Sequence, residues 1–263
     1  MRQRKIKDIE NKLLNYSDLI ISSPKDQIGK WRDLFIGENE SEELTNSRAS
    51  LGSDNRAEYE DSTESTSFRN STLEGRLYVE IGCGKGKFVT ELAELNPNDR
   101  FIAIEGFSSV IIRAVDKARK KELQNVLFVQ DFVYDLGTWF SSGEIDGIYL
   151  NFSDPWPKKK NAKRRLTYRD RLEQYAKALA PGGFIRIKTD NDDFFQFTLE
   201  EVEECNSRRK RTDGQDAFDV VAFTRDLHKS EWKDLTPMTE YETKFKGAGK
   251  NINFVEIKNG GNF

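Results

Sequence analysis

Glycines and carboxylates gather where three predicted strands end. The first strand runs into the sequence Val79-Glu80-Ile81-Gly82-Cys83-Gly84-Lys85-Gly86. Glycines allow a sharp turn and a close approach of a ligand to the backbone. Glu105 follows the second predicted strand and Asp131 follows the third. Because open α/β sheets bind ligands at the carboxyl ends of their strands, we expect Glu80, Gly82, Gly84, Glu105 and Asp131 to share one site.

The chemistry of these residues favours S-adenosylmethionine as the cofactor. Glu105 could accept hydrogen bonds from both ribose hydroxyls, and Asp131 from the adenine amino group. Glu80 could stabilise the cationic amino and sulfonium end. A pyrophosphate would be repelled, and the spacing is G-x-G-x-G, not the G-x-G-x-x-G of dinucleotide sites. The alternative is that a glycine turn and strand-terminal acids build an α/β fold or bind NAD, and the glycine motif alone would not decide between them.

A second group of residues, after the fourth predicted strand, points to RNA. This strand ends in Asn151-Phe152-Ser153-Asp154-Pro155-Trp156-Pro157. The prolines restrict the loop and would position Asp154 and Trp156, whose ring could stack on a base. The basic residues that follow could neutralise phosphates; they are Lys158, Lys159, Lys160, Lys163, Arg164 and Arg165. A run of charge is often only a solvated surface, but here it directly follows an active-site strand.

The charge distribution is compatible with a nucleic-acid partner although the net charge is −3. Residues 38–64 hold nine acidic residues and two basic ones, so this segment contributes −7 and the remainder of the chain carries about +4. Net charge is a poor guide when one segment dominates it.

Strands and helices alternate from residue 76 onward, which predicts a parallel sheet covered on both faces. We expect a Rossmann-like α/β fold with a seven-stranded, mostly parallel sheet. Helices are expected after the glycine turn, where Phe88, Leu92 and Leu95 would share a face, over 108–123 and over 168–179. The predicted strands cover residues 77–81, 101–104, 126–129, 145–151, 184–189, 218–223 and 253–257.

Three regions are predicted along the chain. Residues 1–37 form a basic, partly helical extension, residues 38–72 an acidic linker or insertion without regular structure, and residues 73–263 the catalytic domain. Cys83 and Cys205 stand far apart, so no disulfide or zinc site is proposed and no metal is expected. The basic N-terminus lacks the apolar region of a signal peptide, and no apolar run is long enough to span a membrane, which indicates a cytoplasmic protein.

Several motifs together resemble the bacterial tRNA (guanine-N7-)-methyltransferase family. These are Val79 to Gly86, Asp154 to Pro157 with Lys158 and Lys163 to Leu166, Ile187 to Asp190, Thr224 to His228, Met238 to Glu242 and the basic start Arg2-Gln3-Arg4-Lys5. The resemblance implies a class I methyltransferase fold and methyl transfer to guanine N7 in tRNA, in the variable loop.

The resemblance also implies roles for individual residues. The counterparts of Glu80, Glu105, Asp131 and Asp154 bind the cofactor, and Asp154 is also catalytic. The counterparts of Lys158, Asp190, Thr239, Glu240, Tyr241 and Glu242 bind substrate, and those of Lys160, Lys163, Arg164 and Arg165 contact RNA. The chain departs from the family pattern at Asn161, where a histidine is common, and in the length of the acidic segment.

Mechanistically, guanine N7 can attack a methyl group without losing a proton, so no strong general base is expected. Asp154 is the candidate for stabilising the developing positive charge, and Asp190 and Glu242 are candidates for accepting the guanine N–H groups. Two alternatives remain, namely an amino-group methyltransferase of the adenine N6 type and a non-catalytic RNA-binding protein. No obligatory protein partner is predicted, and the chain is expected to be a monomer or homodimer.

Overall fold

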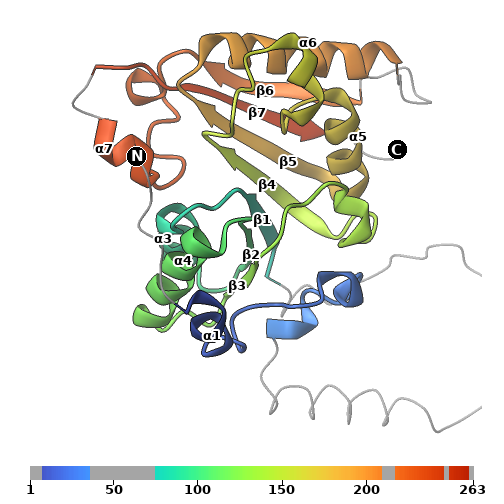
Figure 1. The fold of residues 1–263 in the computed structure, drawn as a ribbon. Coiled ribbons are helices and arrows are strands. Elements are labelled where there is room, and N and C mark those ends of the chain that lie inside the picture. Colours follow the sequence, from blue (N-terminus) through green and yellow to red (C-terminus); the bar gives the residue numbers. More distant parts are fainter. Residues whose placement is uncertain (1–7, 36–74, 209–216, 246–248, 261–263) are drawn as a thin grey trace, which may run out of the picture.

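The computed structural model describes residues 8–35, 75–208, 217–245 and 249–260. Its centre is a seven-stranded sheet in the order β3-β2-β1-β4-β5-β7-β6. The first five of these strands in the order are parallel, whereas β7 is antiparallel to β5 and β6 is antiparallel to β7. The predicted α/β fold and strand number are confirmed (Figure 1). The strands are β1 Leu77–Ile81, β2 Arg100–Ile104, β3 Val126–Val129, β4 Ile145–Asn151, β5 Leu179–Thr189, β6 Phe218–Thr224 and β7 Asn253–Asn259.

Helices cover both faces of this sheet, because the strand side chains that point to each face are largely apolar. One face packs on α3 (Lys87–Leu95) and α4 (Ser108–Lys120) through one apolar cluster. The other packs on α5 (Arg169–Ala178) and α6 (Asp192–Arg208) through a second cluster. Near-continuous burial along β1 and β3 is the pattern of strands covered on both faces.

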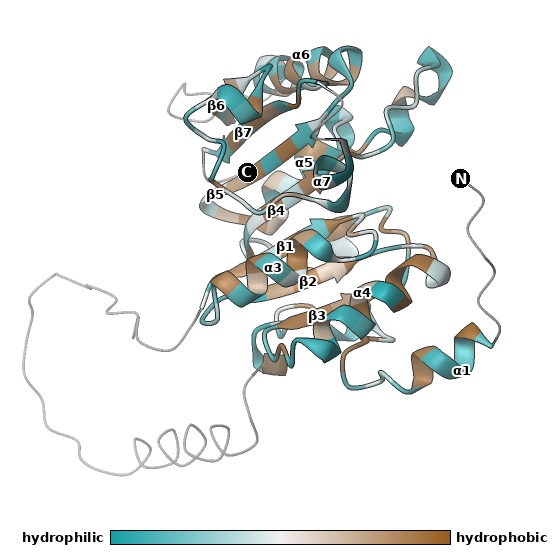
Figure 2. Cartoon of the chain, turned by 90° about the vertical axis from the view of Figure 1, so that its left-hand side faces the viewer, coloured by the Kyte–Doolittle hydropathy of each residue, from teal (hydrophilic) through white to brown (hydrophobic). Residues whose placement is uncertain are grey.

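The N-terminal segment docks on the domain. Helix α1 (Ile9–Leu14) lies beside α4 (Figure 2). Ile20 forms a parallel bridge with Phe128 at the free edge of β3. Farther along, Trp31 is fully buried, and its Nε1–H donates to the Trp139 carbonyl over 2.7 Å. Residues 8–35 are therefore part of the same packed unit, while the predicted acidic linker, 38–72, lies outside the described residues.

The remaining helical elements are short. They are η1 Pro24–Gln27, η2 Asp33–Phe35, η3 Leu136–Thr138, η4 Lys159–Arg164, η5 Leu227–Lys229 and α7 Glu240–Phe245. Within the described part of the chain, no helix has the length and apolar character needed to cross a bilayer.

Some predicted boundaries were wrong, each for a local reason. Leu95 does not share the buried face of α3 but is 69% exposed, because the helix ends there. Helix α4 ends at Lys120 instead of residue 123. Strand β5 begins at Leu179, five residues before the prediction, because Leu179 pairs with Ile145 before the register shifts to Gly147 and Phe184. The glycines after Pro181 thus form an irregularity inside the strand and not a turn before it.

Candidate active site

The glycine loop after β1 adopts a conformation that explains its composition. Gly82, Gly84 and Gly86 have φ of 82°, 59° and 74°, in the left-handed region that other residues rarely adopt. A Cβ atom at Gly82 or Gly84 would meet nothing within 4 Å, whereas one at Gly86 would lie 2.5 Å from the Ala114 Cβ. The first two glycines therefore leave open space beside the backbone, and the third allows α3 and α4 to pack closely.

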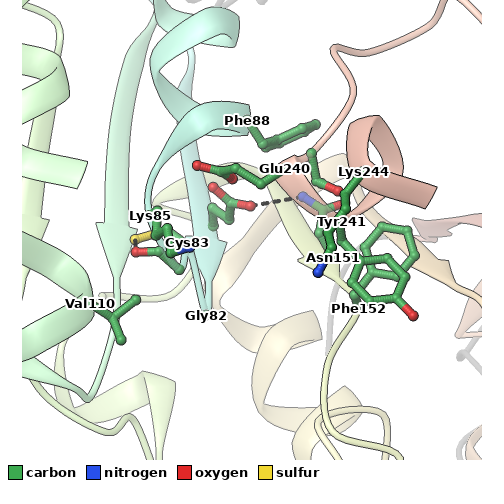
Figure 3. A pocket seen from close by; sticks show the side chains of 13 residues that line it. Gly82, Cys83, Lys85, Phe88, Val110, Asn151, Phe152, Glu240, Tyr241 and Lys244 are labelled. Carbon is green, nitrogen blue, oxygen red and sulfur yellow. Dashed lines mark hydrogen bonds between the residues drawn. The ribbon is translucent and has the colours of Figure 1, made fainter. Parts of the chain in front are cut away.

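A cavity of about 440 Å³ lies beside this loop (Figure 3). Its walls come from the end of β1, the glycine loop, the start of α4, the end of β4 and helix α7. Asn151 at the end of β4 and Phe152 directly after it line the cavity, and Tyr241 lines it from α7. The volume is in the range of sites that hold a small-molecule ligand. Segments separated by more than 150 residues in the sequence thus form one pocket.

Glu80 is buried in the wall of this cavity, with 3% of its surface exposed. One carboxylate oxygen, Oε1, accepts a hydrogen bond from Asn151 Nδ2 over 2.8 Å. The other, Oε2, is buried and has no hydrogen-bond partner among the described residues. Burial raises the pKa of Glu80 to about 8, and the nearby carboxylates of Glu240 and Glu105 add to this effect. A cationic ligand group would satisfy this oxygen, so the site fits the amino end of S-adenosylmethionine.

Glu105 and Asp131 occupy the same edge of the sheet but differ in how they are held. The half-buried Glu105 accepts hydrogen bonds from the Gly84 amide over 3.1 Å and from the Phe107 amide over 3.0 Å. Asp131 is exposed and accepts only a short local bond, 2.7 Å, from the Phe132 amide among the hydrogen bonds described. The structure therefore brings Glu80 and Glu105 to the glycine loop, while Asp131 lies at the neighbouring strand end; of these three acids, only Glu80 lines the cavity.

The loop that carries Asp154 begins at the cavity and leads away from it. Phe152, which lines the cavity, has φ of 52°, and Trp156 has φ of 39°. Positive φ values are uncommon at residues other than glycine and occur where surrounding contacts hold the backbone. The Phe152 amide donates to the Lys188 carbonyl over 2.8 Å, which anchors the start of the loop to β5. Asp154 itself is exposed, two residues beyond Phe152.

The basic segment after this loop divides into exposed and engaged residues. Lys158, Lys160 and Lys163 are exposed, as is Arg164, whose guanidinium lies 4.9 Å from the centre of the Trp156 ring. Arg165 is half-buried and donates hydrogen bonds back to the loop. With Lys159, which is also exposed, the structure therefore presents five of the six basic side chains of this segment to solvent but not Arg165.

Helix α7 explains the Thr239 to Glu242 motif as a capping box. The Glu242 amide donates to Thr239 Oγ1 over 3.1 Å, and the Thr239 amide donates to Glu242 Oε2 over 2.8 Å. This reciprocal pair satisfies backbone groups at the start of a helix. Both residues are buried, and their side chains hold the start of the helix; Thr239 also lines the cavity.

Glu242 also pairs with a buried lysine that the sequence analysis missed. Lys188 Nζ lies 3.3 Å from Glu242 Oε2 and donates to the Pro237 carbonyl over 3.1 Å. Burial lowers the pKa of Lys188, although the carboxylate of Glu242 opposes this shift. With its oxygens engaged in this way, Glu242 is not placed to accept guanine N–H groups as we had expected.

The other two residues of the motif, Glu240 and Tyr241, connect α7 to other elements around the cavity. Glu240 Oε1 accepts hydrogen bonds from the Lys87 amide over 3.1 Å and from Lys117 Nζ over 2.7 Å. The Tyr241 ring lies 4.7 Å from the ring of Phe152, and its hydroxyl donates to Asp190 Oδ2 over 2.7 Å. Glu240 therefore joins α7 to α3 and α4, and Tyr241 joins it to Phe152 and Asp190.

Asp190 receives a second hydrogen bond from Lys250 Nζ, over 2.6 Å. Partial burial would raise the pKa of Asp190, but the hydrogen bonds from Lys250 and Tyr241 outweigh it and lower the pKa. Asp190 is therefore held as a carboxylate beside the cavity residue Tyr241. Lys250 and Lys117 carried no motif by which the sequence could have identified them, and Asn151 stood at the start of the Asp154 run without a role assigned to it.

Comparison with known proteins agrees with this geometry. Residues 74–255 match the protein family described as "Putative methyltransferase". The chain is 38% identical over 252 residues to a tRNA (guanine-N(7)-)-methyltransferase of Geobacillus kaustophilus. The aligned region covers 96% of this chain and 94% of that protein. It is 45% identical over 189 residues to a protein of the same name from Mycoplasmopsis pulmonis. The aligned region covers 72% of this chain and 84% of that protein.

A solved structure shares the fold at low sequence identity. The 16S rRNA methyltransferase KamB superposes with a TM-score of 0.50 and 12% identity, over 85% of this chain and 94% of that one. This similarity supports the architecture of the sheet and its helices.

Proposed function

Because the chain belongs to the tRNA (guanine-N7-)-methyltransferase family, we propose that it transfers the methyl group of S-adenosylmethionine to N7 of a guanosine in tRNA. One observation carries the proposal to this chain: a cavity bounded by open glycines and the buried acid Glu80 adjoins the loop that carries Asp154 and an exposed basic segment. The cofactor-binding and RNA-binding elements therefore meet at one edge of the sheet.

S-adenosylmethionine supplies an activated methyl group on a positively charged sulfur. Glu80 would face its cationic amino end, because this residue lines the cavity and its buried Oε2 atom has no hydrogen-bond partner among the described residues. Glu105, held by the Gly84 amide, would accept hydrogen bonds from the ribose hydroxyls. Asp131, at the next strand end, is proposed to accept one from the adenine amino group.

On the guanine side, the chain's task is to orient the base and to stabilise charge. The N7 lone pair lies in the plane of the ring and can attack the methyl carbon in line, so the residues need not remove a proton. Holding the base in this geometry accounts for much of the expected rate gain. Asp154 is proposed to stabilise the positive charge that the purine acquires.

Recognition of the guanine edge is assigned to Asp190. Its lowered pKa keeps a carboxylate beside Tyr241, where it can accept N–H groups of the base. Glu242, an earlier candidate for the same role, is instead proposed to maintain α7. Lys158, Lys160, Lys163 and Arg164 are proposed to bind tRNA phosphates, because all four are exposed on one segment.

The proposal is tested by incubating the purified chain with labelled S-adenosylmethionine and unmodified tRNA, followed by nucleoside analysis. Label in 7-methylguanosine is the expected result. Label in N6-methyladenosine would instead support the amino-group enzyme. Binding of tRNA without any transfer would support the non-catalytic RNA-binding protein. Mapping the labelled nucleotide also tests whether the modified guanosine lies in the variable loop. The molecular mass of the same preparation in solution tests whether the chain is a monomer or a homodimer. A cytoplasmic location is part of the proposal.

A further inference from the structure

Arg165 contacts the backbone of the loop that carries Asp154. Its Nε–H donates to the Pro155 carbonyl over 2.9 Å, and its Nη2 atom donates to the Trp156 carbonyl over 3.1 Å. These are the two residues directly after Asp154. A guanidinium is a rigid, planar fork of donors, so it can fix two successive carbonyls in one orientation.

The prolines of this loop limit the hydrogen bonds that can hold its backbone. Pro155 and Pro157 have no backbone N–H to donate, and Trp156 between them has φ of 39°. A residue other than glycine in this region is strained and persists only where its surroundings hold it. The two bonds from Arg165 fall on the carbonyl before Trp156 and on that of Trp156 itself, where this backbone bends.

The guanidinium is itself supported from a different element. Its central carbon lies 4.1 Å from the centre of the Phe197 ring on α6. Helix α6 is anchored in the interior by Phe194 and Phe195, which are 1% and 0% exposed. A guanidinium over an aromatic face is stabilised by attraction to the ring. Arg165 therefore connects a rigid helix to the loop.

We propose that Arg165 is a positioning residue for Asp154, which acts through the Pro155 and Trp156 carbonyls with Phe197 as its support. Phosphate binding is left to the exposed neighbours Lys160 and Lys163. This inference rests on the proposed function, because it takes Asp154 to be the residue that acts on the reacting base. It changes the role of Arg165 from the RNA contact that the family resemblance implies.

The two roles predict opposite kinetic effects, and Arg165→Lys distinguishes them. Lysine retains the positive charge but cannot bond two carbonyls as a fork, so a phosphate contact would survive the change and a positioning contact would not. We expect the single-turnover rate of methyl transfer to fall by about tenfold or more, because small displacements of reacting groups are costly. The affinity for tRNA should remain within about threefold of wild type, because the charge that contributes to phosphate binding is retained.

Lys163→Gln provides the contrast within the same segment. Removing this exposed charge should weaken tRNA binding and reduce the slope of log affinity against log salt by about one. Arg165→Gln removes the same charge, but the slope should stay near that of wild type while the single-turnover rate falls. Lys177→Gln, an exposed position on α5 away from the site, controls for the loss of a charge as such.

Phe197→Leu tests the support without altering any charge. We expect the transfer rate to fall by about threefold to tenfold, with the salt dependence of binding unchanged, because the ring's attraction for Arg165 is lost. In the double variant with Arg165→Gln, the Phe197 change should lower the transfer rate little further, since both substitutions act through one contact. Thermal unfolding and the affinity for S-adenosylhomocysteine, measured for each variant, show whether the fold and cofactor site are intact.

The inference is overturned if Arg165→Lys transfers at the wild-type rate, or if Arg165→Gln lowers affinity and salt slope as Lys163→Gln does. Failure of the proposed function would look different, because the wild-type chain would then place no methyl group on guanine N7 at all.

Discussion

The proposed cofactor side and the proposed substrate side of the cavity are built on different principles. On the cofactor side, the functional groups stand at strand ends and a glycine loop, and their positions follow from the backbone of the parallel sheet. On the substrate side, most candidate residues bind one another: Thr239 with Glu242, Glu242 with Lys188, and Tyr241 with Asp190. The first region presents chemistry directly, and the second is largely a set of supports for the few groups that would touch RNA.

This difference explains which substitutions should act on chemistry and which on architecture. A strand-end acid such as Glu80 can be changed with little effect on neighbouring elements, since its one described hydrogen bond is to Asn151. A residue such as Glu242 connects β5 to the start of α7, so its replacement affects a whole element.

The largest effect on chemistry is expected at Asp154. Asp154→Ala should lower the single-turnover rate on the order of 100-fold or more, because a preorganised charge beside the reacting base is lost. Affinity for tRNA should change little, since the exposed basic side chains remain. Asp154→Asn, which keeps the size, separates charge from shape, and an undiminished rate in both variants would remove Asp154 from the mechanism.

The largest effect on architecture is expected at the buried pair of the substrate side. Glu242→Ala should reduce the free energy of unfolding by about 3–5 kcal/mol, because Lys188 would be left as a buried charge without its carboxylate. Chemical denaturation measures the change. The double variant Glu242→Gln with Lys188→Met should recover part of the loss, because neither charge is then buried. If Glu242→Ala unfolds like wild type but loses tRNA affinity, Glu242 is a substrate ligand and not a support.

On the cofactor side, Glu80 gives a dependence on pH whose sign follows from its raised pKa. The folded protein keeps the Glu80 proton up to about pH 8, whereas an unfolded chain releases it near 4.5. The contribution of the neutral acid to stability is therefore present at low pH and lost as pH rises toward 8, by at most about 1.4 kcal/mol per pH unit. Glu80→Gln should remove this dependence, measured as the difference in Tm between variant and wild type from pH 5 to 8.

The same variant should bind S-adenosylhomocysteine more weakly than wild type, because Glu80 can release its proton to pair with the cationic amino group, whereas an amide cannot ionise. A variant with unchanged cofactor affinity would place that group elsewhere in the cavity. Asn151→Ala, which removes the hydrogen bond to Oε1, serves as the control for the geometry of the carboxylate.

The smallest effect is expected where the two sides meet at α7. Tyr241→Phe removes the hydrogen bond to Asp190 but keeps the ring against Phe152. The loss of one hydrogen bond to a charged group corresponds to about 1.5–3 kcal/mol at most, and less here because Lys250 still pairs with Asp190. We expect KM for tRNA to rise by a few fold with little change in kcat; a fall in kcat alone would assign Tyr241 to the chemical step.

Sequence reasoning identified the elements whose signal is local. The seven strands, the glycine loop and the acids at strand ends follow from apolar runs and the residues that end them. Helix and strand ends were less accurate, because pairing such as that of Leu179 with Ile145 depends on a neighbouring strand.

Roles on the substrate side were harder to predict, because they depend on contacts between distant residues. Nothing local to Arg165 reveals that it turns toward Pro155 and Phe197, and nothing local to Lys188 reveals Glu242. One signal was present but not used: Thr239 followed three residues later by Glu242 is the spacing of a capping box.

The central claim, transfer to guanine N7, is tested most directly with a tRNA that carries 7-deazaguanosine at the single methylated position. This base replaces the attacking nitrogen with a carbon and leaves the rest of the purine unchanged. We predict tRNA affinity within about twofold of the unmodified transcript, because phosphate contacts dominate binding, and no methyl transfer. Continued transfer to the substituted nucleotide would contradict the account.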